Sequence, residues 1–386
     1  MLVTAERIDK DSQMPEAWQP LAGAALLERL RVTGRPRPSL DPALSRRLRD
    51  RLDYGLEFLI QPDVDPAPIV VTKDRLTQVL ACEAHHVASQ FGERRPSQAM
   101  ACGALVDSLF RQLLATGSIG DPMTDGLAAL ALDDHQRGLV DWIGRLPGPQ
   151  RSELAVEVER QAAGLVARWP RLSPGWLPRT QEPIKASLAG GRVLLSARVD
   201  LAIGRPAVNH ASVGIVELKS GKRRAEHRAD LHFYALIEAL RSPAPPFMVA
   251  TYYSRTGELD VEPVSEDLLA AAARRTIAAA EALYRLAAGA EPNRTPNPLC
   301  GWCDALPTCA PGQERTGTSI PYDGSGSGGG PEDDPRRGED QHEAQPGGQR
   351  PSDAGRDGAQ QGDLWPGGAG PDQSRHGDPR QGEGQP

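Results

Sequence analysis

The chain has 386 residues, enough for two or three domains, but its composition is uneven. From residue 311 onward, 76 residues contain 19 glycines and 10 prolines and carry 14 acidic against 7 basic side chains. Residues 1–310 are balanced, with 37 charges of each sign, so the net charge of −7 belongs to the C-terminal segment. Such a polar, glycine-rich segment cannot bury a core, and we predict that residues 311–386 are a disordered acidic tail.

The sequence pattern also argues against three classes of protein. No run of 18 apolar residues exists, so no membrane span is expected. The N-terminus reaches its first charges without an apolar stretch, which predicts a cytoplasmic rather than a secreted protein. Five cysteines in a chain that is not secreted argue against a disulfide framework.

The first half of the chain has the residue spacing of helices. Residues 1–66 are predicted to form a helical, arginine-rich N-terminal extension, in which leucines at helical spacing indicate an amphipathic helix over 43–60. A helical block follows from 72 to 167. Its helices are predicted over 72–89, 103–116, 133–146 and 151–169, and Thr72 is the expected N-cap of the first.

The pattern then changes to short apolar runs typical of strands. Strands are predicted over 183–188, 193–203 and 213–218, followed by a helix over 225–241, a hairpin of 247–253 with 258–264, and a helix over 265–287. The strand–helix–strand order implies a crossover, and therefore a mixed sheet with helices on its faces. We predict an α/β domain over 67–310, with a central sheet of about five strands flanked by helices.

Charged residues end two of these otherwise apolar strands. Asp200 lies near the end of one strand, and Glu217 and Lys219 end the next. Side chains alternate along a strand, so Glu217 and Lys219 face the same side, and antiparallel pairing would bring Asp200 beside them. Lysine is rare in this chain, with five residues against 39 arginines, which makes a lysine at this position more informative.

Two carboxylates at this spacing suit a hard cation such as Mg²⁺ or Mn²⁺. Such an ion binds a phosphodiester oxygen and lowers the pKa of its water, while a neighbouring lysine holds that water and stabilises negative charge in the transition state. The residues alone leave a second interpretation open, in which an exposed strand carries a Glu–Lys pair on its polar face.

These segments resemble the RecB-type branch of the PD-(D/E)XK nuclease superfamily. The similarity is carried by residues 198–204, 216–221 and 227–236, within a region from about 72 to 309. It implies a restriction-endonuclease-like core in which Asp200, Glu217 and the backbone carbonyl of Leu218 bind the metal and Lys219 is the catalytic lysine. Tyr234 matches the tyrosine of a Gln-x-x-x-Tyr helix motif behind the active site, and we assign it to the DNA-binding residues.

Two positions depart from the pattern of that branch. Its Gly-x-x-x-His helix motif here runs from Gly103 to Asp107, so an aspartate replaces the histidine that meets the metal. Aspartate is a competent Mg²⁺ ligand, and Asp107 therefore stays in the predicted metal site. Asp230 stands where glutamine is usual in the Gln-x-x-x-Tyr motif. Both departures bear on metal preference and catalytic efficiency.

Three of the five cysteines, Cys300, Cys303 and Cys309, lie within ten residues. A Cys-x-x-Cys turn lets two thiolates converge on one metal, and a tetrahedral thiolate site or a cubane cluster needs a fourth ligand. Cys82 and Cys102 are the cysteines that remain. From spacing alone, an iron–sulfur cluster and a Zn²⁺ site are both open.

The same resemblance favours one fourth ligand. Iron–sulfur members of the branch, including CRISPR adaptation nucleases and the AddB recombination subunit, bind a 4Fe–4S cluster through one upstream cysteine and a C-terminal cysteine trio. This layout implies Cys82 as the upstream ligand and leaves Cys102 as a small buried apolar residue. Zn²⁺ held by the trio with Cys82, His85 or His86 is the alternative, and otherwise we interpret both histidines as surface residues.

The sequence predicts a metal-dependent deoxyribonuclease, an exonuclease acting on single strands or duplex ends in DNA repair or recombination. Lys222, Arg223 and His227 surround the start of the next helix and are predicted to grip phosphates, with solvated charges as the alternative. A DNA-binding subunit without catalysis and a CRISPR spacer-adaptation nuclease are the alternative functions. No Gly-x-x-x-x-Gly-Lys-[Ser/Thr] motif is present, so unwinding would need a helicase partner.

The tail contains one isolated apolar pair, Leu364 and Trp365. Together with Gln361 this pair resembles the short Gln-x-[Asp/Ser]-Leu-aromatic peptides that bacterial replication proteins insert into a groove of the sliding clamp. An apolar pair in a polar segment has nothing of its own to pack against, which is typical of a docking motif. Chance similarity is the alternative interpretation.

Overall fold

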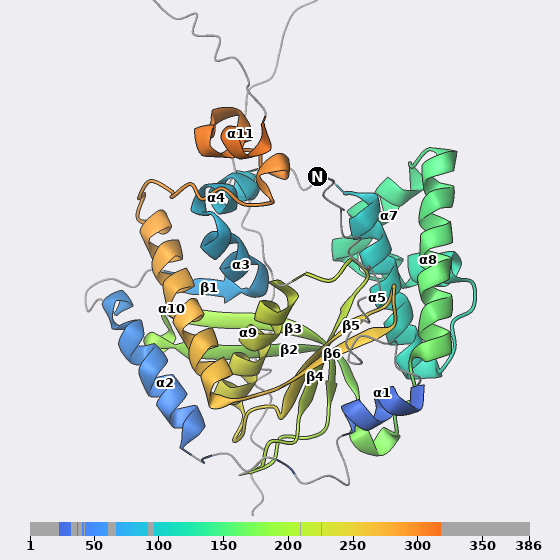
Figure 1. Ribbon diagram of the computed structural model, residues 1–386, viewed down its shortest axis with the longest axis horizontal. Helices are drawn as coiled ribbons and strands as arrows, with labels where there is room; N and C mark the ends of the chain where they lie inside the picture. The colour runs from blue at the N-terminus through green and yellow to red at the C-terminus, as the bar shows by residue number, and fades with distance from the viewer. Residues whose placement is uncertain are drawn as a thin grey trace, which may run out of the picture. The chain divides into compact units, whose positions relative to one another are not determined.

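The computed structural model describes residues 23–31, 37, 41, 43–60, 67–91, 96–208, 210–224 and 226–317 (Figure 1). All of these residues belong to one compact unit. The motif formed by Gln361, Leu364 and Trp365 lies outside the described residues. Within the described part of the chain, no helix is both long and apolar enough to cross a membrane.

In this part of the chain, six strands form one mixed sheet. They are β1 (Ile69–Thr72), β2 (Arg179–Leu188), β3 (Val193–Ile203), β4 (Gly214–Lys219), β5 (Met248–Tyr253) and β6 (Glu258–Pro263). The strand order is β1-β3-β4-β5-β6, and β2 pairs with β3. The pairs β1–β3 and β4–β5 are parallel, whereas the pairs β2–β3, β3–β4 and β5–β6 are antiparallel.

Strands β1 and β4 share one edge of β3 and approach each other end to end. β1 runs parallel to the first part of β3, from Ile69 opposite Val193 to Thr72 opposite Ser196. β4 runs in the opposite direction along the last part of β3, beginning at Gly214. The carboxyl ends of both strands therefore point toward the middle of β3, and the residues that follow each strand meet there.

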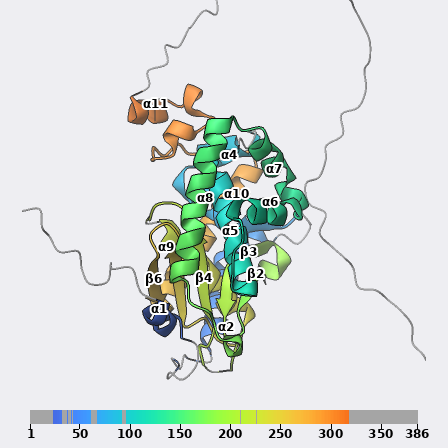
Figure 2. The same ribbon diagram turned by 90° about the vertical axis from the view of Figure 1, so that its right-hand side faces the viewer.

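Helices cover both faces of the sheet (Figures 1 and 2). One face packs against α2 (Leu44–Gly55), α3 (Lys73–Ala81), α9 (Glu226–Arg241) and α10 (Glu266–Ala287). The other packs against α1 (Gly23–Leu30), α5 (Gln98–Thr116), α6 (Pro122–Ala131), α7 (Arg137–Gly144) and α8 (Gly148–Arg168). α4 (Glu83–Phe91) and α11 (Ala310–Thr316) lie together at one end of the domain (Figure 1).

Local sequence signals explain where several of these helices begin. Four helices, α3, α5, α6 and α10, start after a residue whose side-chain oxygen accepts a backbone N–H of the first turn: Thr72, Ser97, Asp121 and Ser265. This contact satisfies one of the unpaired N–H groups at a helix start. The leucines of α2 face inward, and Leu44, Leu48 and Leu52 are buried.

The predicted fold class is confirmed, with three differences in detail. The sheet has a sixth strand, β1, which is only four residues long and follows a proline-containing segment. An alternation of apolar and polar residues cannot be recognised over so short a strand. The helix predicted over 72–89 is divided at Cys82, whose backbone is extended, into α3 and α4. α6, which starts with a proline at its first position, was not predicted.

Helices at both ends of the described chain pack with the predicted nuclease domain. The leucines of α2, within the expected N-terminal extension, pack in the same core as β2, β3, α9 and α10, because a leucine stripe needs an apolar partner. At the other end, α11 continues to Thr316, past the limit expected at residue 310. Its buried Gly312 lies against Cys309, which ties this helix to the cysteine segment.

Candidate active site

Three carboxylates from three elements line one cleft of about 370 Å³. Asp107 comes from the middle of α5, Asp200 from β3 and Glu217 from β4. Leu218 and Lys219 line the same cleft. The antiparallel pairing of β3 with β4, with Leu201 opposite Val216, brings Asp200 beside Glu217. The structure therefore brings together all five residues that the sequence predicts for the metal and catalytic site.

Hydrogen bonds fix the orientation of Asp200. The backbone N–H of Leu218 donates to Asp200 Oδ2 over 2.8 Å, and the side-chain amide of Gln181 lies 3.4 Å from Asp200 Oδ1. The same amide nitrogen lies 3.2 Å from Asp107 Oδ1. Arg111, one turn farther along α5, contacts Asp107 Oδ2 at 3.2 Å.

Glu217 is buried, and its hydrogen bonds all involve one of its two carboxylate oxygens. Lys219 Nζ lies 2.7 Å from Glu217 Oε1, Lys73 Nζ lies 3.1 Å from it, and the hydroxyl of Tyr234 donates to it over 3.5 Å. The other oxygen, Oε2, is buried without a hydrogen-bond partner. A buried acceptor without a partner is costly, and Glu217 lines the same cleft as two further carboxylates.

The three carboxylates of this site differ in the direction of their pKa shifts. Burial raises the pKa of Asp200 well above its ordinary value, and the charges of Glu217 and Asp107 raise it further. Burial likewise raises the pKa of Asp107, although Arg111 opposes the shift. Burial alone would raise the pKa of Glu217, but Lys73 and Lys219 outweigh it and the pKa is lowered.

The donor set fits a hard divalent cation. Three carboxylates and the backbone of Leu218 supply oxygen ligands, which Mg²⁺ and Mn²⁺ prefer. A cation between Asp107, Asp200 and Glu217 would offset their mutual repulsion and give Glu217 Oε2 a partner. As the side chains stand, no three His, Cys, Asp or Glu residues in the described chain are close enough to hold one ion.

A sequence model of the PD-(D/E)XK nuclease superfamily matches residues 71–310. The chain belongs to this superfamily. Membership implies phosphodiester hydrolysis, and PD-(D/E)XK nucleases typically use Mg²⁺ or Mn²⁺. No curated protein matches the chain.

Among solved structures, the chain is similar to a candidate exonuclease from Eubacterium rectale. The two share 15% sequence identity over 61% of this chain and 86% of the other, with a TM-score of 0.39.

Lys73 is a site residue of this PD-(D/E)XK domain that the sequence analysis missed. It is the first residue of α3, directly after β1, and it reaches Glu217 because the ends of β1 and β4 converge. Burial alone would lower the pKa of Lys73, but the carboxylate of Glu217 raises it well above its ordinary value. The sequence signal that could have indicated Lys73 as a site residue is the rarity of lysine in this chain.

Replacing Lys73 with methionine is expected to lower the free energy of unfolding by about 1.5–3 kcal/mol, the range for hydrogen bonds to charged groups. Glu217 is buried and would lose one of its two ammonium partners. Urea denaturation at pH 7 measures this change. Lys185→Met, at an exposed position of β2, is the matched control, and equal stability of the two variants would contradict the assigned contact.

Tyr234 and Asp230 of α9 lie behind the carboxylates. Tyr234 is only 2% exposed and its hydroxyl points to Glu217, so it positions this carboxylate and has no surface for the DNA contact that we predicted. Asp230 accepts a hydrogen bond from Thr77 of α3 and lies 3.9 Å from Lys219 Nζ. Asp230, which stands where the resemblance predicts a glutamine, thus lies near the lysine that we predict to be catalytic.

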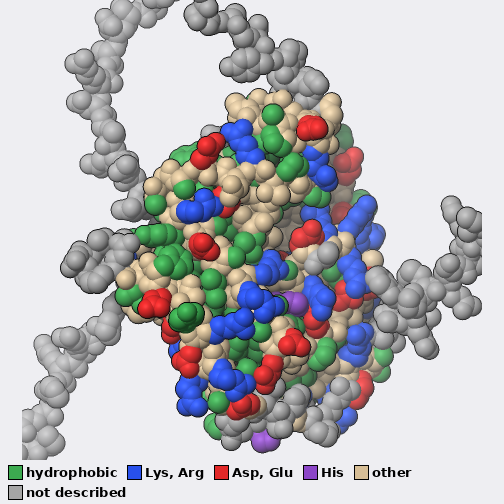
Figure 3. Space-filling view, turned by 60° about the vertical axis from the view of Figure 1, so that its left-hand side comes forward, with side chains coloured by type: hydrophobic (Ala, Val, Ile, Leu, Met, Phe, Trp, Pro, Cys, Tyr) green, Lys and Arg blue, Asp and Glu red, His purple; other side chains and the backbone are tan. Residues whose placement is uncertain are grey.

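The predicted phosphate contacts are divided between two surfaces. Lys222 and His227 line the active-site cleft, together with Arg224. Arg223 instead pairs with Asp260 of β6 at 2.8 Å and lines a neighbouring cavity that also contains Arg224. Burial, with Lys219 and Arg224, lowers the pKa of His227 to about 4, so the imidazole is neutral at pH 7. On the face drawn in Figure 3, Lys and Arg side chains gather across the middle.

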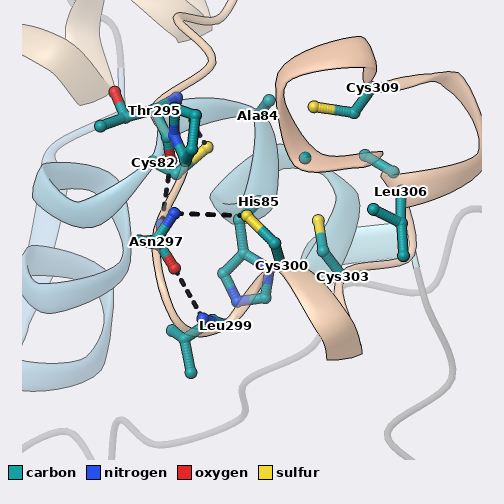
Figure 4. A pocket seen from close by; sticks show the side chains of 13 residues that line it. Cys82, Ala84, His85, Thr295, Asn297, Leu299, Cys300, Cys303, Leu306 and Cys309 are labelled. Carbon is teal, nitrogen blue, oxygen red and sulfur yellow. Dashed lines mark hydrogen bonds between the residues drawn. The ribbon is translucent and has the colours of Figure 1, made fainter. Parts of the chain in front are cut away.

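Four cysteines line a second pocket, at the end of the domain formed by α4 and α11. Cys82 lies between α3 and α4, and Cys300, Cys303 and Cys309 come from the C-terminal segment. Figure 4 shows their sulfur atoms turned toward a common space. Cys102 lies elsewhere, where it accepts a hydrogen bond from Gln161 and burial raises the pKa of its thiol to about 11.

The surroundings of these sulfur atoms suit thiolate ligands. The backbone N–H of Thr295 donates to Cys82 Sγ over 3.4 Å, and that of Asn297 donates to Cys300 Sγ over 3.3 Å. Hydrogen bonds of this kind stabilise and tune metal-bound sulfur. Burial raises the pKa of Cys303 and the other three cysteines raise it further, although a hydrogen bond from the backbone of Ala305 opposes the shift.

The two histidines of α4, which we predict to be surface residues, are partly or fully buried. His86 is 2% exposed, and its Nε2 lies 2.7 Å from the side-chain nitrogen of Gln90. His85 lines the cysteine pocket, and its Nδ1 is buried without a hydrogen-bond partner (Figure 4). The C-terminal segment packs against this helix, where the backbone N–H of Ala84 donates to the carbonyl of Asn293.

Proposed function

We propose that this PD-(D/E)XK protein is a metal-dependent deoxyribonuclease that acts as an exonuclease on single strands or duplex ends in DNA repair or recombination, in the cytoplasm. The observation that carries the proposal is the convergence of Asp107, Asp200 and Glu217 with Lys219 in one cleft, with Glu217 Oε2 buried and unpartnered. An intact set of carboxylates and lysine favours catalysis over a role in DNA binding alone.

Asp107, Asp200, Glu217 and the carbonyl of Leu218 would hold Mg²⁺ or Mn²⁺. When bound, the ion polarises the scissile phosphate and lowers the pKa of water beside it. Lys219 orients the attacking water and stabilises the negative charge that develops on the phosphate oxygens. Lys73 and Tyr234 keep Glu217 Oε1 in place, which leaves Lys219 free to turn toward the substrate.

The geometry supports this division of roles between the two lysines. Both contact the same oxygen of Glu217. Lys73 stands on the first turn of α3, next to the ring of Tyr234, with its nitrogen 5.8 Å from the ring centre. Lys219 ends β4 and borders the cleft, directly before the loop that carries Lys222 and Arg224.

The test is a cleavage assay with purified full-length protein and Mg²⁺ or Mn²⁺. Linear single-stranded DNA labelled at either end, blunt duplex, circular single-stranded DNA and RNA of the same sequence are compared. We expect degradation of linear single strands, with circles resistant because an exonuclease needs an end. Cleavage of circles would identify an endonuclease, and binding of DNA without cleavage in either ion would favour the DNA-binding subunit.

We also propose that the four cysteines hold a 4Fe–4S cluster, with Zn²⁺ as the alternative. The support is the meeting of Cys82 with Cys300, Cys303 and Cys309, and the N–H groups directed at two of the sulfur atoms. The donor chemistry fits, because four thiolates are the usual ligands of such a cluster. Its role would be structural, joining the start of the helical block to the C-terminal segment.

Two partners complete the proposal. A helicase would supply single strands, since the chain has no phosphate-binding loop motif. The sliding clamp would be bound through Gln361, Leu364 and Trp365, with the glutamine at the edge of the groove and the apolar pair in its pocket. A tail of this composition would give the nuclease reach to DNA near the clamp.

A further inference from the structure

Gln181 has an unusual backbone conformation for a residue inside a strand. Its φ of 52° lies in the left-handed region, where a side chain other than glycine is strained. It belongs to β2, in which Thr180 pairs with Leu201 and Glu182 pairs with Val199 of β3. Gln181 therefore lies opposite Asp200, one of the carboxylates of the candidate active site.

The strain coincides with a change in the faces of β3. Val193, Leu195 and Val199 pack in the core that contains α9 and α10, whereas Leu201 and Ile203 pack in the core that contains α5 and α8. In a regular strand, residues 199 and 201 would share one face. The distortion falls at Asp200, and it places this carboxylate within reach of the same amide as Asp107 of α5.

The amide of Gln181 bridges the two carboxylates. Its nitrogen lies 3.2 and 3.4 Å from the two oxygens of Asp107 and 3.4 Å from Asp200 Oδ1. An amide nitrogen carries two protons, one for each carboxylate, and adds no charge of its own. Each carboxylate oxygen keeps a lone pair for a cation, so the amide can hold both groups while an ion binds them.

We propose that Gln181 is a positioning residue for the divalent cation, and that its strained backbone aims the amide so that it holds Asp107 and Asp200 near each other. This inference rests on the proposed function, because it assumes that these carboxylates bind the ion. Strain of this kind persists in proteins where the surrounding structure and a function require it. Without the amide, repulsion would drive the two carboxylates apart and weaken ion binding.

The test measures ion binding and stability separately, in the full-length protein without DNA. Mn²⁺ binding is followed by electron paramagnetic resonance, with Mg²⁺ as competitor, and thermal unfolding is recorded without metal. Gln181→Gly removes both the amide and the strain. Ala189→Gly is the matched control, because Ala189 of the β2–β3 connection has a φ of 49° and its N–H donates to Asp53, outside the candidate active site.

We expect Gln181→Gly to weaken Mn²⁺ binding by about tenfold or more, as for other residues that orient metal ligands, without lowering the unfolding temperature. Ala189→Gly should leave Mn²⁺ affinity unchanged. Gln181→Met keeps the backbone strain and the side-chain length but lacks the amide donor. It should weaken Mn²⁺ binding as much as Gln181→Gly does, so the test stays decisive if the glycine variant does not fold.

Unchanged or tighter Mn²⁺ binding in the Gln181→Met variant would overturn the inference. So would a loss of affinity in Ala189→Gly equal to that in Gln181→Gly, because the effect would then come from the backbone alone. Failure of the wild-type protein to bind Mn²⁺ would instead contradict the proposed metal site itself. The two failures are therefore distinguishable.

Discussion

Replacing Lys219 with alanine is expected to reduce DNA cleavage by about 10²–10³-fold, the usual cost of removing one group that stabilises transition-state charge. The protein should stay folded, because Glu217 keeps Lys73 and the hydroxyl of Tyr234 as partners. Single-turnover cleavage of labelled single-stranded DNA with Mn²⁺ measures the chemical step. Binding of the same DNA, measured by fluorescence anisotropy with Ca²⁺, should change far less than the rate.

Two controls make this result specific. Lys185→Ala removes an exposed lysine of β2 that lies outside the cleft and should cleave at the wild-type rate. Lys219→Arg keeps the charge but changes its shape, and should recover only part of the activity. Wild-type cleavage by Lys219→Ala would show that another group stabilises the charge, with Lys73 as the first candidate because it contacts the same oxygen.

Replacing Cys82 with serine should abolish binding of the proposed metal and lower the free energy of unfolding by more than about 4 kcal/mol, since loss of a metal site belongs to the largest effects of single substitutions. Cys82 is separated from Cys300 by more than two hundred residues, yet the two line one pocket. A site that joins such distant segments contributes directly to folding. Iron, sulfide and zinc are measured in protein purified without oxygen, alongside urea denaturation.

Cys102→Ser is the matched control for this experiment. Cys102 is also buried, but its partner is Gln161, which can donate equally to a hydroxyl, so we expect a change in stability of about 1 kcal/mol and full metal content. A cluster should give a brown protein with absorption near about 400 nm. Zinc without iron would refute the cluster while keeping the metal site, and full metal content in Cys82→Ser would refute Cys82 as a ligand.

The pKa shifts of the carboxylates in the candidate active site agree with the roles that these substitutions test. Asp200 and Asp107 resist ionisation because they are buried near other carboxylates, whereas Glu217 is kept ionised by two lysines. Strongly shifted pKa values of neighbouring groups are typical of functional sites. Removing either lysine would change how readily these carboxylates ionise. We therefore expect substitutions of Lys73 and Lys219 to have the largest effects among substitutions around the cleft.

The sequence by itself determined the class of the fold and predicted residues that meet in one cleft. Alternation along β4 put Glu217 and Lys219 on one side of the strand, and their contact at 2.7 Å agrees with it. The helix start at Thr72 and the long final helix were also readable. These features depend on residues two to four positions apart, and local geometry alone relates such neighbours.

Only the tertiary structure decided which distant residues complete the site. Lys73 lies 144 residues before Glu217, and Gln181 lies 74 residues after Asp107. The break of the helix at Cys82 likewise depends on the C-terminal segment that covers it, through bonds from Ala84 to Asn293 and from Thr295 to Cys82. No local period encodes such contacts, because they arise from strand pairing and from the convergence of β1 and β4 on β3.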